Sequence, residues 1–122
     1  MIEQSEDFEI AANLNLYFND NYRLLKYSEK ANEVVYISYT QKGNAITAHI
    51  AALNTQSKRL LRRAVREATK TFFTVYDWCE VILVAIDKVS VYNLLKKSNF
   101  KLLKTYQIKN KIIRVMGVCR YE

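Results

Sequence analysis

The order of the elements predicted between Ile46 and Met116 constrains the fold of this chain more than any other feature of its sequence. The segment 79–86, CEVILVAI, is almost entirely apolar after Glu80, which is typical of a central strand buried on both faces. A strand and a helix precede it, and a helix and a β-hairpin follow it. The predicted ranges are a strand at 45–53, a helix at about 58–73, a helix from 88 to about 98, and antiparallel strands at 101–108 and 112–119.

The helix at about 58–73 separates its apolar residues from its basic residues. Asn54-Thr55-Gln56-Ser57 precedes it and supplies residue types that cap helices. Apolar side chains at spacings of three and four predict one buried face, made of Leu61, Ala64, Val65, Ala68 and Phe72. The opposite face carries a basic stripe, made of Arg59, Arg62, Arg63, Arg66 and Lys70. The stripe is typical of a solvated face, and its arginines also suit phosphate or carboxylate partners.

The first 44 residues are predicted to contribute a helix and one strand of a hairpin. The strand is rich in β-branched and aromatic residues, and the turn after it places Gly43 where a positive φ is needed. The segment 22–27 fits either a short helix or a strand. The predicted ranges are a helix at 6–18, a turn at 19–21, a strand at 34–40 and a turn at 41–44.

Composition is typical of a folded protein with one domain at residues 1–122. Half of the residues are hydrophobic, which is enough to fill one core at this length. There is no proline and there are two glycines, so a glycine-built phosphate loop is not expected. The sequence has no apolar run that could span a membrane, and its acidic start lacks a secretion signal. We therefore expect a soluble protein that stays inside a cell.

Charge is unevenly distributed along this chain of net charge +7. Residues 1–33, expected to be an acidic helical segment, hold seven acids and three bases and carry a net charge of −4. Residues 34–122, expected to be a basic module of sheet and helices, carry +11. Such asymmetry has three explanations: an acidic ligand, an acidic partner, or ion pairs between the two parts of the chain.

The cysteines and the histidine do not form a site by their spacing. Cys79 and Cys119 lie in apolar runs, which predicts free buried thiols; a disulfide requires that their strands be neighbours. His49 is the single histidine, so neither zinc ligation nor a Ser-His-Asp set is expected. A structural or surface role is predicted for His49.

Residues 87–100 carry the best match to a known family. Asp87-Lys-Val-Ser-Val-Tyr-Asn-Leu-Leu-Lys-Lys-Ser-Asn-Phe100 resembles the signature Asn-x-x-Ala-x-x-Leu-Tyr-x-x-x-Gly-Phe of the GCN5-related N-acetyltransferases (GNAT). Residues 46–116 also follow the element order of that family. The resemblance implies an α+β fold of the three-layer type, with a mixed central sheet of about five to six strands, flanking helices and a C-terminal β-hairpin. In the family, the start of the basic helix receives coenzyme A.

Two departures from the family pattern weigh against catalysis. The family begins its basic helix with Gln/Arg-x-x-Gly-x-Gly/Ala, whose glycines let backbone N–H groups approach the pyrophosphate, but residues 54–61 contain no glycine. The tyrosine that often acts as general acid in the family aligns with Leu95, which cannot donate a proton. Tyr92, one helical turn earlier, is the substitute if the protein is active.

A smaller group with this fold shows similar departures. Short-tailed bacteriophages encode small proteins that have a degenerate acetyltransferase fold and are tied to assembly of the internal virion core. This chain resembles them at Ser57-Lys58-Arg59, Tyr76-Asp77-Trp78, Asn93-Leu94-Leu95-Lys96 and Asn99-Phe100. The resemblance implies a phage-encoded accessory or virion-assembly factor in the cytoplasm of a bacterial host, with association with the virion as a further expectation.

Three functions are therefore compared. The main hypothesis is a non-catalytic protein without cofactor or metal, which binds an acidic or phage structural protein through the basic stripe. One alternative is an active acetyl-CoA-dependent N-acetyltransferase that uses Tyr92 for proton transfer and holds the coenzyme with Gln56, Ser57, Lys58 and Arg59. The second alternative is a basic phage inhibitor of a host defence or nucleic-acid-binding complex. The stripe lacks interleaved aromatic residues, which disfavours direct binding of nucleic acid.

Overall fold

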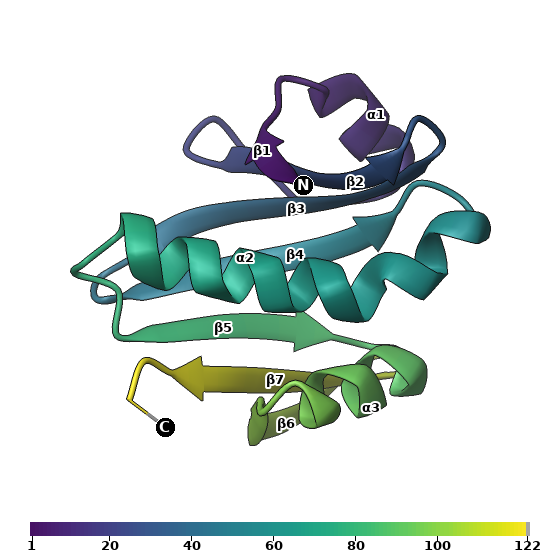
Figure 1. Cartoon of the computed structure of the whole chain (residues 1–122). Helices are drawn as coiled ribbons and strands as arrows, with labels where there is room; N and C mark the ends of the chain where they lie inside the picture. Colours follow the sequence, from purple (N-terminus) through teal and green to yellow (C-terminus); the bar gives the residue numbers. More distant parts are fainter. Residues whose placement is uncertain (122) are drawn as a thin grey trace.

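The computed structural model describes residues 1–121 and contains one seven-stranded mixed sheet (Figure 1). Along the sheet the strands lie in the order β1-β2-β3-β4-β5-β7-β6. β4 and β5 are parallel, and the other neighbouring pairs are antiparallel. The strands are β1 (Ile2–Gln4), β2 (Arg23–Lys30), β3 (Glu33–Lys42), β4 (Ala45–Ala52), β5 (Val81–Ile86), β6 (Lys101–Ile108) and β7 (Lys111–Cys119).

Helices cover both faces of this sheet. The helices are α1 (Phe8–Asn13), a 3-10 helix η1 (Gln56–Leu60), α2 (Leu61–Val75) and α3 (Val89–Lys97). In Figure 1, α2 runs along one face of the sheet and α3 lies on the same side, near β6 and β7. The mixed sheet, the helices and the C-terminal hairpin confirm the predicted GNAT-like α+β fold, with more strands than the five to six that we expected.

The main core lies between α2 and the sheet. Phe72 of α2 is buried, and its ring lies 4.7 Å from that of Tyr39 on β3. In β5, Ile82 and Val84 belong to this core, whereas the alternate residue Leu83 is half-buried on the other face. The expectation that this strand is buried on both faces is therefore only partly right, because none of the helices in residues 1–121 covers the second face of β5 as α2 covers the first.

A second, smaller core lies on the opposite face of the sheet, under α1. It contains Ala11 of α1, Leu24 of β2 and Tyr36 of β3. Leu24 and its neighbour Leu25 are both buried but belong to different cores, because successive residues of a strand point to opposite faces. The first third of the chain thus covers part of the far face of the sheet, over β2 and β3.

The acidic segment 1–33 contains strands as well as a helix. The segment 22–27, left open between helix and strand, lies almost entirely in β2, and β1 pairs with it. The predicted helix at 6–18 is shorter, because α1 ends at Asn13 and Asn15 adopts a left-handed φ of 59°. Asparagine tolerates this conformation and ends helices. The apolar spacing that predicted a longer helix continues past the end of α1, because Leu16 in the following loop also packs into the second core.

Of the two cysteines, which were both predicted to be buried, only one is buried. Cys79 is buried and donates its thiol hydrogen to the carbonyl of Val81 at 3.4 Å, and burial raises its pKa. Cys119 is exposed at the end of β7, opposite Val81 in the register of the two strands. None of the helices described is both long and apolar enough to cross a membrane.

Candidate functional site

The parallel strands β4 and β5 separate near their carboxyl ends. Their pairing stops at Ala48 and Val84, although β4 continues to Ala52 and β5 to Ile86. The opening lies directly before the turn that leads into η1 and α2. The carboxyl ends of parallel strands are where open sheets of this kind commonly bind ligands. We therefore take this opening as the candidate site.

A small apolar cavity lies in the opening, beneath α2. Its volume is about 30 Å³, which is the space of roughly one water molecule. The lining residues are Ile37, Ala48, His49, Ile50, Val65, Ala68, Thr69, Phe72, Ile82, Val84, Leu95 and Phe100. The strands are thus apart, but the space between them is narrow. An extended ligand enters only if side chains at the mouth, such as Thr69, move aside.

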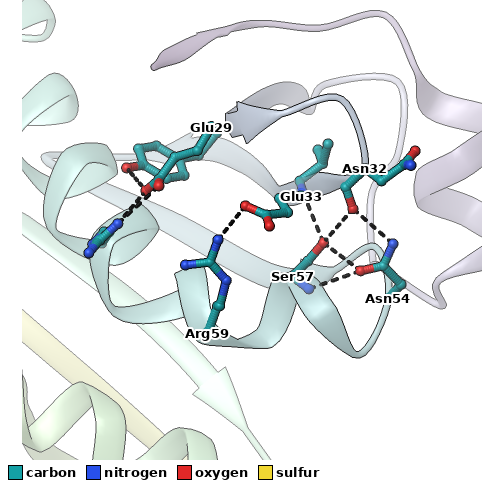
Figure 2. Close-up of polar contacts among 9 residues, drawn as sticks. Glu29, Asn32, Glu33, Asn54, Ser57 and Arg59 are labelled. Carbon is teal, nitrogen blue, oxygen red and sulfur yellow. Dashed lines mark hydrogen bonds and ion pairs between the residues drawn. The ribbon is translucent and has the colours of Figure 1, made fainter.

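Ser57, in the turn after β4, points into the protein (Figure 2). Its hydroxyl accepts the backbone N–H of Val34 at 2.9 Å and lies 2.8 Å from Oδ1 of Asn54. The backbone N–H of Ser57 donates to the same Oδ1 at 2.9 Å, and Nδ2 of Asn54 donates to the carbonyl of Asn32 at 2.9 Å. These bonds hold the start of η1 against the turn between β2 and β3.

Two backbone N–H groups at the start of η1 stay available. Those of Thr55 and Gln56 donate to no acceptor among the residues that the structure describes. η1 leads directly into α2, so these groups stand at the N-terminus of one helical segment, where anions are favoured. The side chain of Lys58 is exposed nearby. The absence of glycine therefore does not place the Ser57 side chain over these N–H groups, because that side chain is buried against Val34.

Two arginines of the basic stripe bind acids from the first part of the chain. Nη1 of Arg63 donates to both carboxylate oxygens of Glu29, at 3.0 and 2.8 Å, and Arg59 pairs with Glu33 (Figure 2). The hydrogen bond from Arg63 lowers the pKa of Glu29, and that from Arg59 lowers the pKa of Glu33. Ion pairs within the chain therefore account for part of the charge asymmetry.

The remaining members of the stripe are exposed. Arg62, Arg66 and Lys70 make no ion pair with any residue in the described part of the chain. Arg62 precedes Val65 by three residues and Thr69 by seven, so helical spacing places it on the side of α2 that borders the cavity. The stripe thus divides into an ion-paired edge and a free edge.

Tyr92, the predicted substitute acid, lies half-buried on α3. Its ring lies 5.1 Å from Cζ of Arg114 on β7 and 5.2 Å from Nζ of Lys96. It precedes Leu95, a buried residue that lines the cavity, by three residues. Tyr92 therefore stands one turn from the candidate site, between two cations. Its role in proton transfer stays a prediction.

His49 is the first residue of β4 after its pairing with β5 ends. Alternation along the strand places its side chain on the face opposite α2, and its ring packs 5.3 Å from that of Tyr17 and 6.0 Å from that of Tyr22. Desolvation lowers the pKa of the imidazole, so the neutral form is favoured. The sequence analysis assigned it no chemistry, because its place beside the opening depends on strand pairing.

The structure resembles solved N-acetyltransferases over almost its whole length. Spermidine N-acetyltransferase from Vibrio cholerae in complex with CoA and spermine superimposes with a TM-score of 0.76, at 10% identity, over 98% of this chain and 95% of the other. The ribosomal-protein-S18-alanine N-acetyltransferase from Escherichia coli gives a TM-score of 0.73 at 10% identity, over 98% of this chain and 92% of the other. No protein-family model and no curated protein matches the sequence.

These likenesses support the GNAT-like fold and correct one expectation. We expected no cofactor because the glycines of the family loop are missing, and the CoA in the matched Vibrio cholerae structure contradicts that expectation. The reasoning failed because it relied on the loop alone, whereas the separation of β4 and β5 is retained. The degenerate state, the phage origin and the role in virion assembly find no support in the comparisons and stay predictions.

Proposed function

We propose that this protein is an acetyl-CoA-dependent N-acetyltransferase. The observation that carries the proposal is the separation of β4 from β5 beyond Ala48 and Val84, at an apolar cavity beneath α2. The likeness to N-acetyltransferases over 98% of the chain supports it. The first alternative of the sequence analysis is thereby preferred to the non-catalytic hypothesis.

The residues around the opening fit the two chemical parts of acetyl-CoA. The apolar walls of the cavity suit the thin pantetheine arm, once Thr69 and its neighbours move. The backbone N–H groups of Thr55 and Gln56, with the side chain of Lys58, face the pyrophosphate. Arg62 lies on the same side of α2 as the cavity and binds a further phosphate of the coenzyme. Ser57 and Arg59, which we also predicted as ligands, position the turn through Val34 and Glu33.

Acetyl-CoA supplies the acetyl group as a thioester. The acceptor amine attacks the thioester carbonyl carbon, so that a C–N bond forms while the C–S bond breaks. His49 accepts the proton that the amine loses, because its imidazole is neutral and stands at the opening. Tyr92 returns a proton to the leaving thiolate. The acceptor is a primary amine, the class to which the spermidine and the alanine in the names of the matched enzymes belong.

Coenzyme binding is tested by calorimetry with acetyl-CoA and with CoA. We expect a dissociation constant in the micromolar range. Thr69→Phe, which fills the mouth of the cavity, should abolish binding, whereas Thr71→Phe, on the same helix but outside the lining, should not. Lys58→Glu should weaken binding about tenfold or more, as expected for loss of a charge-assisted hydrogen bond. No binding of either coenzyme by the wild-type protein would refute the proposal.

Turnover is tested by release of the CoA thiol in the presence of spermidine or of a peptide that begins with alanine. Because the pKa of His49 is lowered, the rate should fall with acid only below pH 6.5, the ordinary pKa of histidine. His49→Gln should remove this acid limb and lower the rate by about 10²-fold or more. An unchanged pH profile in this variant would exclude His49 as the base.

A second proposal concerns the exposed bases of the stripe. Arg62, Arg66 and Lys70 are free of ion pairs with described residues, which favours contact with an acidic protein partner. A polyglutamate peptide should bind the wild-type protein. It should not bind the variant in which Arg62, Arg66 and Lys70 are all replaced by glutamate. Tighter binding of single-stranded DNA than of the peptide would instead favour the nucleic-acid-linked inhibitor. Phage origin and association with the virion are part of this second proposal.

A further inference from the structure

A polar pocket lies at the end of α2 that is far from the candidate acetyltransferase site. Its volume is about 380 Å³, within the range of small-molecule sites. It is formed where the start of β2 and the end of β3 meet the connection between α2 and β5. The lining residues are Asn21, Arg23, Tyr39, Thr40, Gln41, Ile46, Tyr76 and Trp78.

The pocket has a buried floor, aromatic walls and a polar rim. Tyr39 and Ile46, which form the floor, are 3% and 1% exposed. Tyr76 and Trp78 form a wall, with ring centroids 5.4 Å apart. Arg23 stands at the exposed rim. Tyr76 is held in place through its backbone carbonyl, which accepts a hydrogen bond from the Arg120 guanidinium at 2.7 Å. The wall is therefore fixed before any ligand arrives.

The hydroxyls of Tyr39 and Tyr76 both receive hydrogen bonds in this pocket. Nε2 of Gln4 donates to the hydroxyl of Tyr39 at 2.7 Å, and Nη1 of Arg23 reaches the hydroxyl of Tyr76 at 3.4 Å. The two hydroxyls lie 2.9 Å apart, so one donates to the other. Whichever donates, the proton of the second hydroxyl has no acceptor in this network. The pKa of Tyr39 is raised to about 12, mainly by burial, so its hydroxyl keeps its proton at neutral pH.

The charge of Arg23 is also uncompensated. It makes no ion pair with any residue in the described part of the chain, and none of the lining residues is acidic. A guanidinium and a spare hydroxyl proton together favour an anionic acceptor. The flat faces of Tyr76 and Trp78 favour a planar ring beside it.

We propose that this pocket binds a small anion that carries a planar ring, with the anionic group at Arg23 and the Tyr39–Tyr76 hydroxyl pair and the ring against Trp78. The anionic group is a phosphate or a carboxylate. The pocket is distinct from the cavity of the acetyltransferase site, because the two share no lining residue, and α2, 15 residues or roughly 22 Å long, separates it from η1. The inference therefore does not rest on the proposed function.

The single tryptophan of the chain makes the test specific to this pocket. Trp78 lines the pocket, so a change in tryptophan fluorescence during titration reports a ligand there. Adenosine monophosphate and benzoate serve as the phosphate and carboxylate probes, and adenosine as the uncharged control. We expect saturable quenching with at least one anionic probe and at least tenfold weaker binding of adenosine. The better anionic probe identifies the anionic group.

Variants then assign the contacts. Arg23→Gln should weaken binding of the better probe by about tenfold to hundredfold, and Tyr76→Phe should also weaken it, whereas Lys97→Gln on α3 should not. Lys58→Glu, which disturbs the coenzyme site, should leave the quenching unchanged. The inference is overturned if neither anion quenches, if adenosine binds as tightly as the anions, or if Arg23→Gln binds normally. Loss of quenching in Lys58→Glu would mean that the probe binds at the coenzyme site. That result would overturn this inference and leave the proposed acetyltransferase function standing.

Discussion

At the scale of single residues, Ser57 shows that a side chain at a position where the family has glycine need not block a pyrophosphate. The direction in which the side chain points decides this. In a GNAT-like turn we expected a side chain here to crowd a pyrophosphate. Instead Ser57 is fully buried, and its hydroxyl bonds to the backbone of the β2–β3 region. The bulk points into the protein, and the N–H groups of Thr55 and Gln56 remain at the surface. Residue type alone could not reveal this direction.

Replacing Ser57 by alanine should destabilise the protein. The buried backbone N–H of Val34 would lose its acceptor, which costs about 1–3 kcal/mol. Urea unfolding followed by circular dichroism measures the difference. Ser90→Ala is the matched control, since Ser90 is exposed on α3, and its effect should stay within about 0.5 kcal/mol. Equal midpoints for the two variants would mean that the Val34 bond contributes nothing.

The pair of Glu29 and Arg63 makes a prediction about pH. The pKa of Glu29 is below its ordinary 4.5, first because of the hydrogen bond from Arg63 and then because of that from Tyr27. A lowered folded-state pKa stabilises the fold above pH 4.5, and the contribution is lost as pH falls through the folded-state value. In Arg63→Gln, the pKa of Glu29 should rise towards 4.5. NMR titration of the carboxyl carbon measures it.

The control for this titration is Arg66→Gln, which removes an exposed arginine of the same helix without touching Glu29. The pKa of Glu29 should not change in it. A Glu29 titration at 4.5 in the wild-type protein would show that the ion pair does not form in solution.

At the scale of elements, α2 connects the two parts of the molecule. One face packs on the sheet through Ala64, Ala68 and Phe72, and Arg63 on one edge pairs with Glu29 of β2. In the adjoining η1, Arg59 pairs with Glu33 of β3. η1, where we propose that the coenzyme phosphates bind, leads into the start of α2, and the connection after its end supplies Tyr76 and Trp78 to the polar pocket. Both candidate sites therefore depend on how firmly this helix is seated.

Phe72→Ala should be the most damaging truncation in this helix. Phe72 is 1% exposed and contacts the ring of Tyr39, so its loss leaves a cavity and should cost about 3–5 kcal/mol. Val75→Ala, at the exposed end of the same helix, should change stability by no more than about 0.5 kcal/mol. Chemical unfolding of both variants provides the comparison. A cost for Phe72→Ala below that of Val75→Ala would contradict the packing described above.

At the scale of the whole molecule, stability should be unevenly distributed across the sheet. β5 pairs with β4 on one side and β7 on the other, and three of its side chains are buried under the helices. β6 lies at the sheet edge, and all eight of its residues are exposed. Amide hydrogen exchange should therefore be slowest in β5 and much faster in β6. Equal protection of the two strands would show that β6 is covered in solution.

The fold was largely predictable because its second half has strong local signals. Apolar spacing in 58–73, the continuous apolar run at 79–86 and the turn at 109–111 each predicted an element that the structure contains. β1 was not predicted, and the segment 22–27 in β2 was left open between helix and strand, since Arg23 and Lys26 interrupt its apolar alternation. They are strands because β3 offers an edge to β2, and β2 in turn offers an edge to β1.

The candidate sites were less predictable. The residues Gln56, Lys58 and Arg62 stood out in the sequence, but the separation of β4 from β5 depends on where two distant strands stop pairing. The polar pocket brings Arg23 and Trp78 together from positions far apart in the chain. Neither arrangement leaves a periodic or local trace in the sequence, so neither could be located from the sequence alone.

The sequence by itself determined the element order, the apolar face of α2 and its basic stripe, because hydrophobic spacing and charge act between near neighbours in the chain. Tertiary structure decided which arginines pair with Glu29 and Glu33, where Ser57 points, and that β4 and β5 part after Ala48. These outcomes depend on contacts between segments that are distant in sequence. Which residues meet in such contacts, and how their side chains point, is decided only when the chain folds.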